Sequence, residues 1–395
     1  MKIAIVKPDY RIVGGFEIVV DRIIKGLKKY GHKVDLVKVD MVERRYDLGK
    51  IHIPEDIYNQ NDEFFRYTMS IQAYEKLDLS AYDLVIATQP PSFAVNHPNV
   101  VVLFYHHLKI FYDMYEVYMK CIASDEKLHA ETAKLIRKID KEYITNDKFY
   151  LAGSQHVANR LKHFNGIKEE QIQVFKAGIN DTYFNYKGAT SFEYPLCVGR
   201  HEFPKRPELF ISAMKYLPEL QGSLVGTGGR TEDLKIIDAY LQDSYAKGNE
   251  VDGEVLWQEV IFRAHELKYA KSNASNVLFK GKIPDKEVMK EYARALCVIC
   301  PSYEEDYGLT AIEAMAFGKP VIACRDGGGY AEFIEEGKNG FIVEPTGKAI
   351  AEKIKYLKDN PDVLQEMSKN AYESSRKYSW DQVMETFNNA IMKRA

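Results

Sequence analysis

The sequence lacks the features that would place it in several large classes of protein. Its five cysteines form no secreted disulfide pattern, and Cys297 and Cys300 lie in an apolar run with no second pair to complete a metal site. No apolar run approaches the length of a membrane span, and the N-terminal segment carries only the short run Ile3 to Val6, unlike a signal peptide. We therefore expect a soluble, cytoplasmic protein in which Cys297 and Cys300 are core thiols.

The sequence also lacks a large net charge and a complete dinucleotide-binding motif. The formal net charge of the 395 residues is −3, which gives no electrostatic support for a nucleic-acid partner. A G-x-G-x-x-G pattern begins at Gly226, but Thr231 stands where its third glycine would fall, so a nicotinamide-dependent dehydrogenase loses its main support. No Asp-x-Asp pair occurs either, and we expect neither a metal ion nor a cofactor.

What the sequence does contain is a regular alternation of short apolar strands and amphipathic helices. The first series begins with a strand at Lys2 to Val6 and a helix from Glu17 to Tyr30, and a fresh series starts at Tyr194. Such units favour parallel sheets covered by helices, so we predict an α/β protein with two Rossmann-like domains, residues 1–185 and 186–377, facing across a cleft. Ligands of these sheets bind beyond the carboxyl ends of the strands.

Two longer stretches interrupt this alternation. We predict a helical stretch from Phe111 to Ile144 in the first half. In the second half the charged stretch from Asp233 to Ser275 resembles an insertion, with a helix over roughly 254–271. We interpret it as a solvated helical excursion; an interdomain or partner contact is the alternative.

The stretch from Cys297 to Ile334 is the strongest candidate site. A strand is followed by a polar loop with Glu305, and a helix opens at Gly308-Leu309-Thr310 and carries Glu313 one turn in. A helix N-terminus offers unpaired N–H groups to an anion, and carboxylates accept hydrogen bonds from pairs of hydroxyls. The pattern indicates a site for an anionic, polyhydroxylated ligand; a solvated helix is the alternative.

Cations and histidines follow other predicted strands. Arg200 and Lys205 share one loop after a strand and are candidates for a diphosphate clamp, although a pair of surface cations would show the same spacing. His106 and His107 end a strand, where a histidine can bind a sugar hydroxyl or relay a proton. The basic helix face from Arg22 to Lys29 is either solvated or in peripheral contact with an anionic membrane.

Taken together, these segments resemble the family 4 retaining glycosyltransferases of GT-B architecture. The most specific mark is E-x7-E, here Glu305 to Glu313, followed by the run from Ala314 to Ile322. Further similar segments are Gly14-Gly15-Phe16-Glu17, Ser154 to Ala158, Gly178-Ile179-Asn180, Val198-Gly199-Arg200 with Lys205, Val225 to Gly228 and Tyr378-Ser379-Trp380. Asp306-Tyr307, where Pro-Phe is common, and Gly327 to Glu332 depart from the pattern. The resemblance implies that a final helix, about 378–395, crosses back to the first domain.

The resemblance also implies roles for the candidate residues of the second domain. Arg200 and Lys205 would hold the diphosphate of a nucleotide-sugar donor, with backbone N–H groups at Gly308, Leu309 and Thr310. Glu313 would hold the ribose hydroxyls, and Glu305 hydroxyls of the transferred sugar. Gly226 belongs to the opening of this donor domain, and backbone near Ile283 would meet the base.

In the first domain, Gly14 and Gly15 would approach the diphosphate, and one of His106 and His107 would face the reacting sugar. A Tyr-x-His alignment favours His107. The activity implied is metal-independent, retaining transfer of a hexose from a UDP- or GDP-sugar to a hydroxyl of a glycan, lipid-linked or small-molecule acceptor. A nucleotide-sugar 2-epimerase of GT-B fold and a non-catalytic nucleotide-sugar binding protein are the alternatives.

Overall fold

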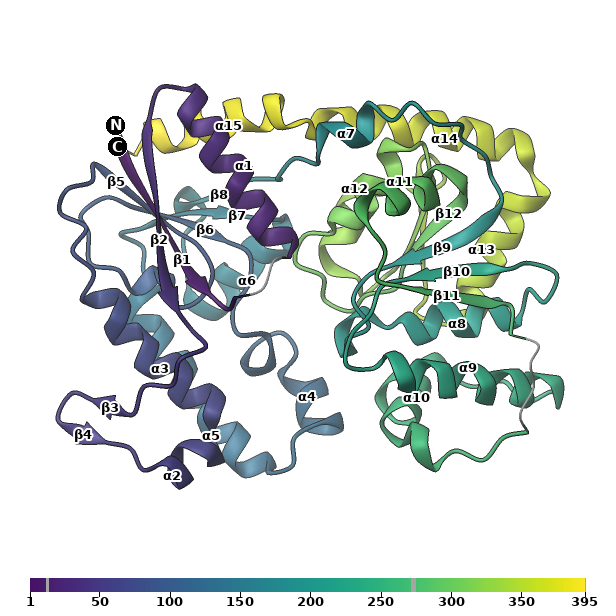
Figure 1. The fold of residues 1–395 in the computed structure, drawn as a ribbon, viewed down its shortest axis with the longest axis horizontal. Coiled ribbons are helices and arrows are strands. Elements are labelled where there is room, and N and C mark those ends of the chain that lie inside the picture. The colour runs from purple at the N-terminus through teal and green to yellow at the C-terminus, as the bar shows by residue number, and fades with distance from the viewer. Residues whose placement is uncertain (12–13, 271–274, 395) are drawn as a thin grey trace. The chain divides into compact units, whose positions relative to one another are not determined.

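The computed structural model describes residues 1–11, 14–270 and 275–394, which form two compact units (Figure 1). The first unit is Met1–Gly178 with Trp380–Ala395, and the second is Ile179–Ser379. We predicted these divisions after residues 185 and 377. The chain enters and leaves the second unit at one place, because the Ile179 N–H donates to the Tyr378 carbonyl oxygen at 3.0 Å.

The first unit is built on a parallel six-stranded sheet in the order β2-β1-β5-β6-β7-β8. Its strands are β1 (Lys2–Asp9), β2 (Lys33–Asp40), β5 (Leu84–Ala87), β6 (Val100–Phe104), β7 (Phe149–Ala152) and β8 (Ile172–Val174). Strands β5, β6 and β7 are buried along their whole length, as their almost entirely apolar sequences require in a sheet covered on both faces. This confirms the predicted parallel α/β sheet.

The helices of the first unit are α1 (Gly15–Lys29), α2 (Glu55–Gln60), α3 (Asp62–Glu75), α4 (Tyr115–Cys121), α5 (Glu126–Tyr143) and α6 (Gln155–Asn165). The stretch from Phe111 to Ile144, predicted as helical, contains two helices, α4 and α5. The chain breaks between α4 and α5, because the Asp125 side chain accepts the Leu128 N–H at 2.9 Å and so begins a new helix. A small hairpin of β3 (Asp47–Leu48) and β4 (Ile51–His52) was not predicted.

The last helix, α15 (Trp380–Met392), packs in the first unit as the resemblance implied. Met384 lies on Gly26 of α1, where a Cβ would meet its Cε at 2.6 Å. The Phe387 ring contacts Phe175 edge-on at 4.8 Å between ring centroids. The C-terminal helix thus completes the apolar core of the unit that holds the N-terminus.

The second unit repeats the architecture with a parallel six-stranded sheet in the order β11-β10-β9-β12-β13-β14. Its strands are β9 (Tyr194–Val198), β10 (Gly222–Val225), β11 (Val277–Gly281), β12 (Ala295–Cys300), β13 (Val321–Cys324) and β14 (Gly340–Val343). Its helices are α7 (Asp181–Phe184), α8 (Pro207–Lys215), α9 (Thr231–Ala246), α10 (Gly253–Gln258), α11 (Asp285–Arg294), α12 (Leu309–Ala316), α13 (Gly347–Asp359) and α14 (Pro361–Ser375). With β9 and β12 at its centre, the loops that follow these two strands lie side by side.

The inserted segment, which we define as residues 231–266, is part of this core. It comprises α9, α10 and a 3-10 segment, Val260–Glu266. Leu234, Ile237 and Leu241 lie on one face of α9 and join the same buried apolar cluster as α8. The interpretation as a solvated excursion is therefore wrong. The helix predicted over roughly 254–271 is present only in part. Helix α10 and the 3-10 segment extend as far as Glu266, the backbone becomes extended at Leu267, and residue 271 lies outside the described residues.

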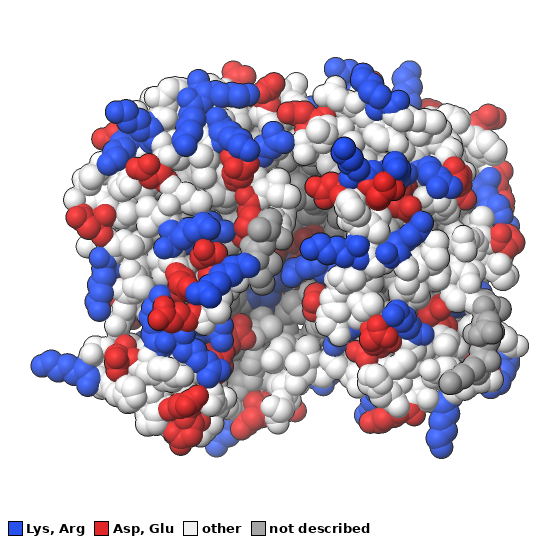
Figure 2. All heavy atoms as spheres, viewed as in Figure 1, with Lys and Arg blue, Asp and Glu red and all other residues white. Residues whose placement is uncertain are grey.

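The surface carries no broad field of one charge on the face shown in Figure 2, where basic and acidic side chains intermingle. Across the parts of the chain that the structure describes, no helix is both long and apolar enough to cross a lipid bilayer.

Candidate active site

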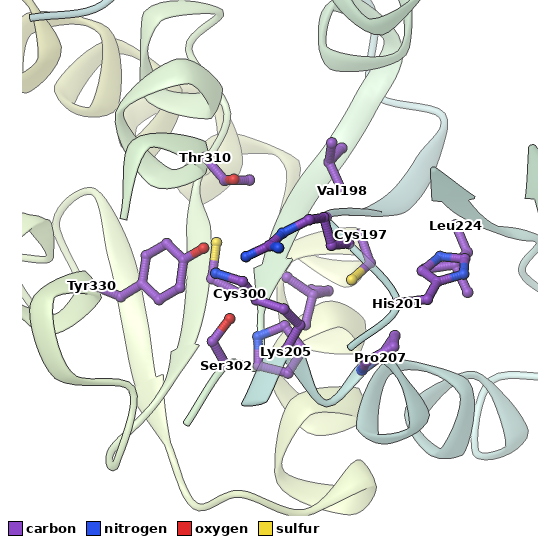
Figure 3. Close-up of a pocket in the computed structure, with 14 residues that line it drawn as sticks. Cys197, Val198, His201, Lys205, Pro207, Leu224, Cys300, Ser302, Thr310 and Tyr330 are labelled. Carbon is purple, nitrogen blue, oxygen red and sulfur yellow. The ribbon is translucent and has the colours of Figure 1, made fainter. Parts of the chain in front are cut away.

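A pocket lies in the second unit beyond the carboxyl ends of β9 and β12 (Figure 3). Residues from β9 and its loop, from β12 and its loop, and from the start of α12 line it, among them Arg200, His201, Lys205, Ser302 and Thr310. Parallel strands end at the same edge of a sheet, which is why these segments, distant in sequence, share one pocket. The structure thus brings the predicted Arg200, Lys205 and Thr310 together.

The loop that carries Arg200 is held by the glycines after β10. A Cβ on Gly226, at φ +131°, would lie 1.8 Å from the carbonyl oxygen of Gly199. The His201 N–H donates to the Thr227 carbonyl oxygen at 3.1 Å. Gly226 is therefore needed for close contact between two backbone segments. Its effect on a ligand would be indirect, through the position of Arg200.

Lys205 and Glu305 form the polar centre of the site. The Lys205 ammonium group donates a short hydrogen bond to Glu305 Oε2, and the two side chains are only 23% and 16% exposed. Arg200, from the same loop as Lys205, is exposed. Two cations therefore line one pocket, and one of them is paired with the carboxylate of Glu305, which is not itself a lining residue. Such an arrangement can bind an anion beside a hydroxyl group.

The N-terminus of α12 completes this side of the pocket. Gly308 precedes the helix with φ +101°, and a Cβ there would lie 2.5 Å from the Tyr330 ring. Tyr330 is in turn hydrogen-bonded to the side chains of Thr310 and Ser302. Gly308, Leu309 and Thr310 thus begin the helix against a buried ring, and of these three residues Thr310 lines the pocket.

Glu313 lies one turn further along α12 and does not line the pocket. Its Oε2 accepts a hydrogen bond from the buried Tyr292 hydroxyl at 3.0 Å. Burial raises the pKa of Glu313 to about 7; the Tyr292 hydrogen bond opposes this rise and the charge of Asp285 adds to it. Glu313 therefore exchanges its proton near neutral pH.

Ile283 follows β11 and is half-buried, between the exposed Lys282 and Pro284. Gly281 just before it has φ +68°, and its carbonyl oxygen accepts the Gly226 N–H at 2.9 Å. The turn at Ile283 is thus anchored to the glycine loop after β10. A planar base could be bound along this turn through backbone groups.

The glycine loop predicted at Gly14-Gly15 lies in the first unit, where Gly14 caps α1. The Gly14 N–H donates to Glu17 Oε2 at 2.9 Å, and the other oxygen of Glu17 accepts from Lys7 Nζ at 3.0 Å. Lys7 is buried, so this pair fixes the entry into α1. Ile12 and Val13, in the same loop, lie outside the described residues.

The two histidines at the end of β6 have different environments. His107 is 1% exposed and stacks on Tyr112 with 4.2 Å between ring centroids, while its Nε2 lies 2.7 Å from Asn165 Oδ1. His106 is half-buried, and its Nδ1 lies 2.7 Å from the His107 carbonyl oxygen. A ring inside an aromatic cluster cannot contact a sugar without repacking. The geometry therefore favours His106 over the alignment-based choice of His107.

These environments predict opposite consequences of substitution. His107→Ala should destabilise the protein by about 2–4 kcal/mol, because it leaves a cavity among aromatic rings and removes the partner of Asn165. His106→Ala should leave the unfolding temperature nearly unchanged and lower turnover about tenfold or more. Thermal unfolding and initial rates on both variants test this. If His107→Ala were stable but inactive, His107 and not His106 would be the histidine that faces the sugar.

Several residues of the site were not singled out from the sequence. Tyr330 and Ser302 line the pocket, Tyr292 binds Glu313, and Arg206 joins the Lys205 loop to Asp326. Only Arg206 could have been singled out as a candidate from the sequence, because it directly follows Lys205. Tyr330 and Tyr292 carry no motif of their own, since tyrosine is common throughout this chain.

Comparison with known proteins agrees with this geometry. Residues 13–183 match the family model described as Glycosyltransferase Family 4, and residues 253–374 match the one described as Glycosyl transferases group 1. The chain belongs to glycosyltransferase family 4. The two parallel sheets are accordingly the two Rossmann-like domains of the GT-B fold, as predicted.

Solved structures show the same fold for this family 4 chain. Sucrose-phosphate synthase from Thermosynechococcus elongatus is 20% identical with a TM-score of 0.67, over 99% of this chain and 98% of that one. HepE from Anabaena, solved in complex with UDP, is 17% identical with a TM-score of 0.62, over the full length of both chains.

Two of the curated relatives of this family 4 chain match over shorter lengths. An uncharacterized glycosyltransferase of Methanocaldococcus jannaschii is 25% identical over 60% of this chain and 57% of its own length. A D-inositol 3-phosphate glycosyltransferase of Corynebacterium efficiens is 36% identical over 26% of this chain and 24% of its own length. This chain therefore spans less than two thirds of the length of either relative.

Proposed function

We propose that this chain is a retaining glycosyltransferase. It would transfer a hexose from a UDP- or GDP-sugar to a hydroxyl of a glycan, a lipid-linked or a small-molecule acceptor. The observation that carries the proposal is that Lys205, which is paired with Glu305, lines one pocket together with Arg200 and Thr310 of α12. Cations and helix N–H groups suit a diphosphate, and a carboxylate beside them suits a sugar hydroxyl.

The leaving diphosphate gains negative charge during the reaction. When the bond between sugar C1 and the diphosphate oxygen breaks, negative charge grows on that oxygen. Lys205, Arg200 and the N–H groups at Leu309 and Thr310 would stabilise this charge. In this scheme they supply the positive charge that a metal ion supplies elsewhere, so we propose metal-independent transfer.

The Lys205–Glu305 pair suggests how the site is kept ready. Both groups are partly buried, so an isolated charge at either position would be costly. With donor bound, Lys205 would turn to a phosphate oxygen and Glu305 to a sugar hydroxyl. Each charge then exchanges one hydrogen-bonded partner for another.

Retention of configuration follows if the acceptor attacks from the side of the leaving group. The acceptor oxygen forms the new bond to C1 as the bond to the phosphate oxygen breaks. The acceptor proton passes to that phosphate oxygen, and the nucleoside diphosphate leaves. The protein then acts by positioning and charge stabilisation, with Glu305 at hydroxyls of the transferred sugar.

Support for a nucleotide donor comes from similar structures. HepE of Anabaena has been solved with UDP and with UDP-glucose. The turn at Ile283 and the ribose partner Glu313 would serve UDP and GDP alike.

Peripheral membrane contact through α1, where Lys25, Lys28 and Lys29 are exposed, stays a prediction.

A ligand and activity screen tests the proposal. Binding of UDP, GDP, ADP and their hexose conjugates is measured by calorimetry, and donor turnover is then followed with and without sugar acceptors. Acceptor-dependent release of nucleoside diphosphate is the expected result. Acceptor-independent release with an epimerised sugar would instead indicate a 2-epimerase, and binding without turnover on any acceptor a binding protein.

The raised pKa of Glu313 predicts that nucleotide binding depends on pH. The ionised carboxylate accepts ribose hydroxyls better than the acid, so affinity should rise with pH through the pKa near 7. If only the ionised form binds, affinity should increase roughly tenfold from pH 6 to pH 8. Calorimetric titration with UDP or GDP at several pH values measures this.

Glu313→Gln is the matched control, because it keeps the shape of Glu313 without its titration. The nucleotide affinity of this variant should change less over the same pH range, and a pH profile identical to that of the wild type would contradict the ribose assignment.

The stability of the wild-type protein should show the opposite trend with pH. The folded pKa lies above the ordinary value of 4.5, so the folded state binds more protons and stability falls as pH rises from about 4.5 to about 7.

A further inference from the structure

Arg206 ties three loops of the candidate site together. It follows Lys205 with a left-handed φ of +47°, and its side chain is fully buried. Its guanidinium group binds both carboxylate oxygens of Asp326 at 2.8 and 2.5 Å. The same group donates to the carbonyl oxygens of Pro301 and Ser302 at 2.7 and 3.2 Å. The Lys205 loop, the Glu305 loop and the loop after β13 are thus joined at one point.

Trp257 of the inserted segment covers this junction. Its ring lies 5.1 Å from the Arg206 guanidinium carbon, and it contacts Phe203 and Tyr303 at 5.0 and 5.2 Å between ring centroids. Trp257 is only 3% exposed. One indole therefore packs on the turn before Lys205 and on the residue that follows Ser302.

A second contact holds the same turn. Arg230 lies over Phe203 at 5.0 Å and over Phe262 at 4.3 Å, and the two phenylalanine rings are 5.5 Å apart. Phe262 belongs to the 3-10 part of the inserted segment. Phe203 is thus held between two parts of the insertion.

The inserted segment can serve as a rigid support because the residues around Trp257 are buried in the core of the second unit. Leu256 and Ile261, on either side of Trp257, belong to the main apolar cluster of the second unit. Gly253 at the start of α10 packs so closely on Pro345 that a Cβ would lie 2.3 Å from its carbonyl oxygen. Trp257 therefore projects from a part of the core that has little freedom to shift.

We propose that the inserted segment is a positioning element for donor binding, in which Trp257 acts through Arg206 to hold Lys205 and Glu305 in place. This inference rests on the proposed function. A left-handed arginine is strained, and its conformation persists only while its surroundings fix it. Without the indole, the Lys205 turn would sample other conformations, and the donor would have to order it on binding.

Trp257→Leu and its conservative counterpart Trp257→Phe test this. The leucine variant should raise the donor KM about tenfold with a smaller change in kcat, while the phenylalanine variant, which keeps an aromatic face over Arg206, should stay within about threefold of wild type. Both are assayed well below their unfolding temperatures. A purely structural role would move the unfolding temperature and leave KM equal in the two folded variants, and that outcome would overturn the inference.

Fluorescence gives an independent readout, because the chain has two tryptophans. In a Trp380→Phe background the emission of Trp257 should change on saturation with UDP or GDP. A constant emission under saturating nucleotide would count against the inference. If Trp257→Leu does not fold, Arg206→Lys, which keeps the charge and loses the planar fork, should show the same rise in KM.

Measurements on the wild-type protein distinguish failure of the proposed function from failure of the positioning role. If it binds no nucleotide and turns over no donor, the proposed function fails. If it binds and turns over donor while Trp257→Leu, Trp257→Phe and Arg206→Lys all keep its KM, only the positioning role fails.

Discussion

Lys205→Ala should lower kcat/KM for the donor by about 10²- to 10³-fold, the usual cost of removing one group that stabilises transition-state charge. Lys205 is the cation directly paired with Glu305, and the pair is partly buried, so its charge acts with little screening by water. Initial rates at varied donor concentration measure the effect. Because the growing charge is on the leaving phosphate, kcat should fall more than KM rises.

The same substitution should have a moderate cost in stability. It leaves the Glu305 carboxylate, which is 16% exposed, without its cation, which should cost about 1–3 kcal/mol in the free energy of unfolding. Arg200→Ala, at an exposed site, should lower turnover without a measurable change in unfolding temperature. Lys355→Ala removes an exposed cation that pairs with Asp359 at 2.9 Å and is the matched control. Near-normal donor turnover in both Lys205→Ala and Arg200→Ala would exclude the diphosphate clamp.

The parts of the site that could be predicted from the sequence are those fixed by sheet topology. Arg200, Lys205 and Thr310 each follow a predicted strand of one parallel sheet, and the carboxyl ends of such strands meet at one edge. Sheet topology alone therefore places these three residues in one pocket, without any knowledge of side-chain contacts. The same reasoning placed His106 and His107 at a strand end, but it could not tell the buried ring from the half-buried one.

Contacts between segments distant in sequence could not be predicted. Arg206 meets Asp326 and Trp257, and Gly308 meets Tyr330, only because loops on different strands fold against each other. Apolar periodicity in α9 was a usable signal for the burial of the insertion. The high charge of that segment indicates exposure, but the positions of Leu234, Ile237 and Leu241 on one face of α9 are what decide its burial.

Gly308→Ala should be among the most damaging single substitutions at the site. At φ +101° an L-residue is strained by about 1–3 kcal/mol. The added Cβ would also lie 2.5 Å from the buried Tyr330 ring, which must then shift or be overpacked at a further cost of about 1–3 kcal/mol. We expect a loss of about 2–6 kcal/mol in the free energy of unfolding, the sum of the two costs, measured by denaturant titration.

Gly337→Ala separates the two causes, because Gly337 also has a positive φ, +74°, but a Cβ there meets nothing within 4 Å. It should cost about 1–2 kcal/mol from backbone strain alone and leave donor turnover intact. Gly308→Ala should in addition abolish most donor turnover, since displacing Tyr330 displaces Thr310 and the first turn of α12. A Gly308→Ala protein with normal nucleotide affinity would show that the start of α12 does not contact the diphosphate.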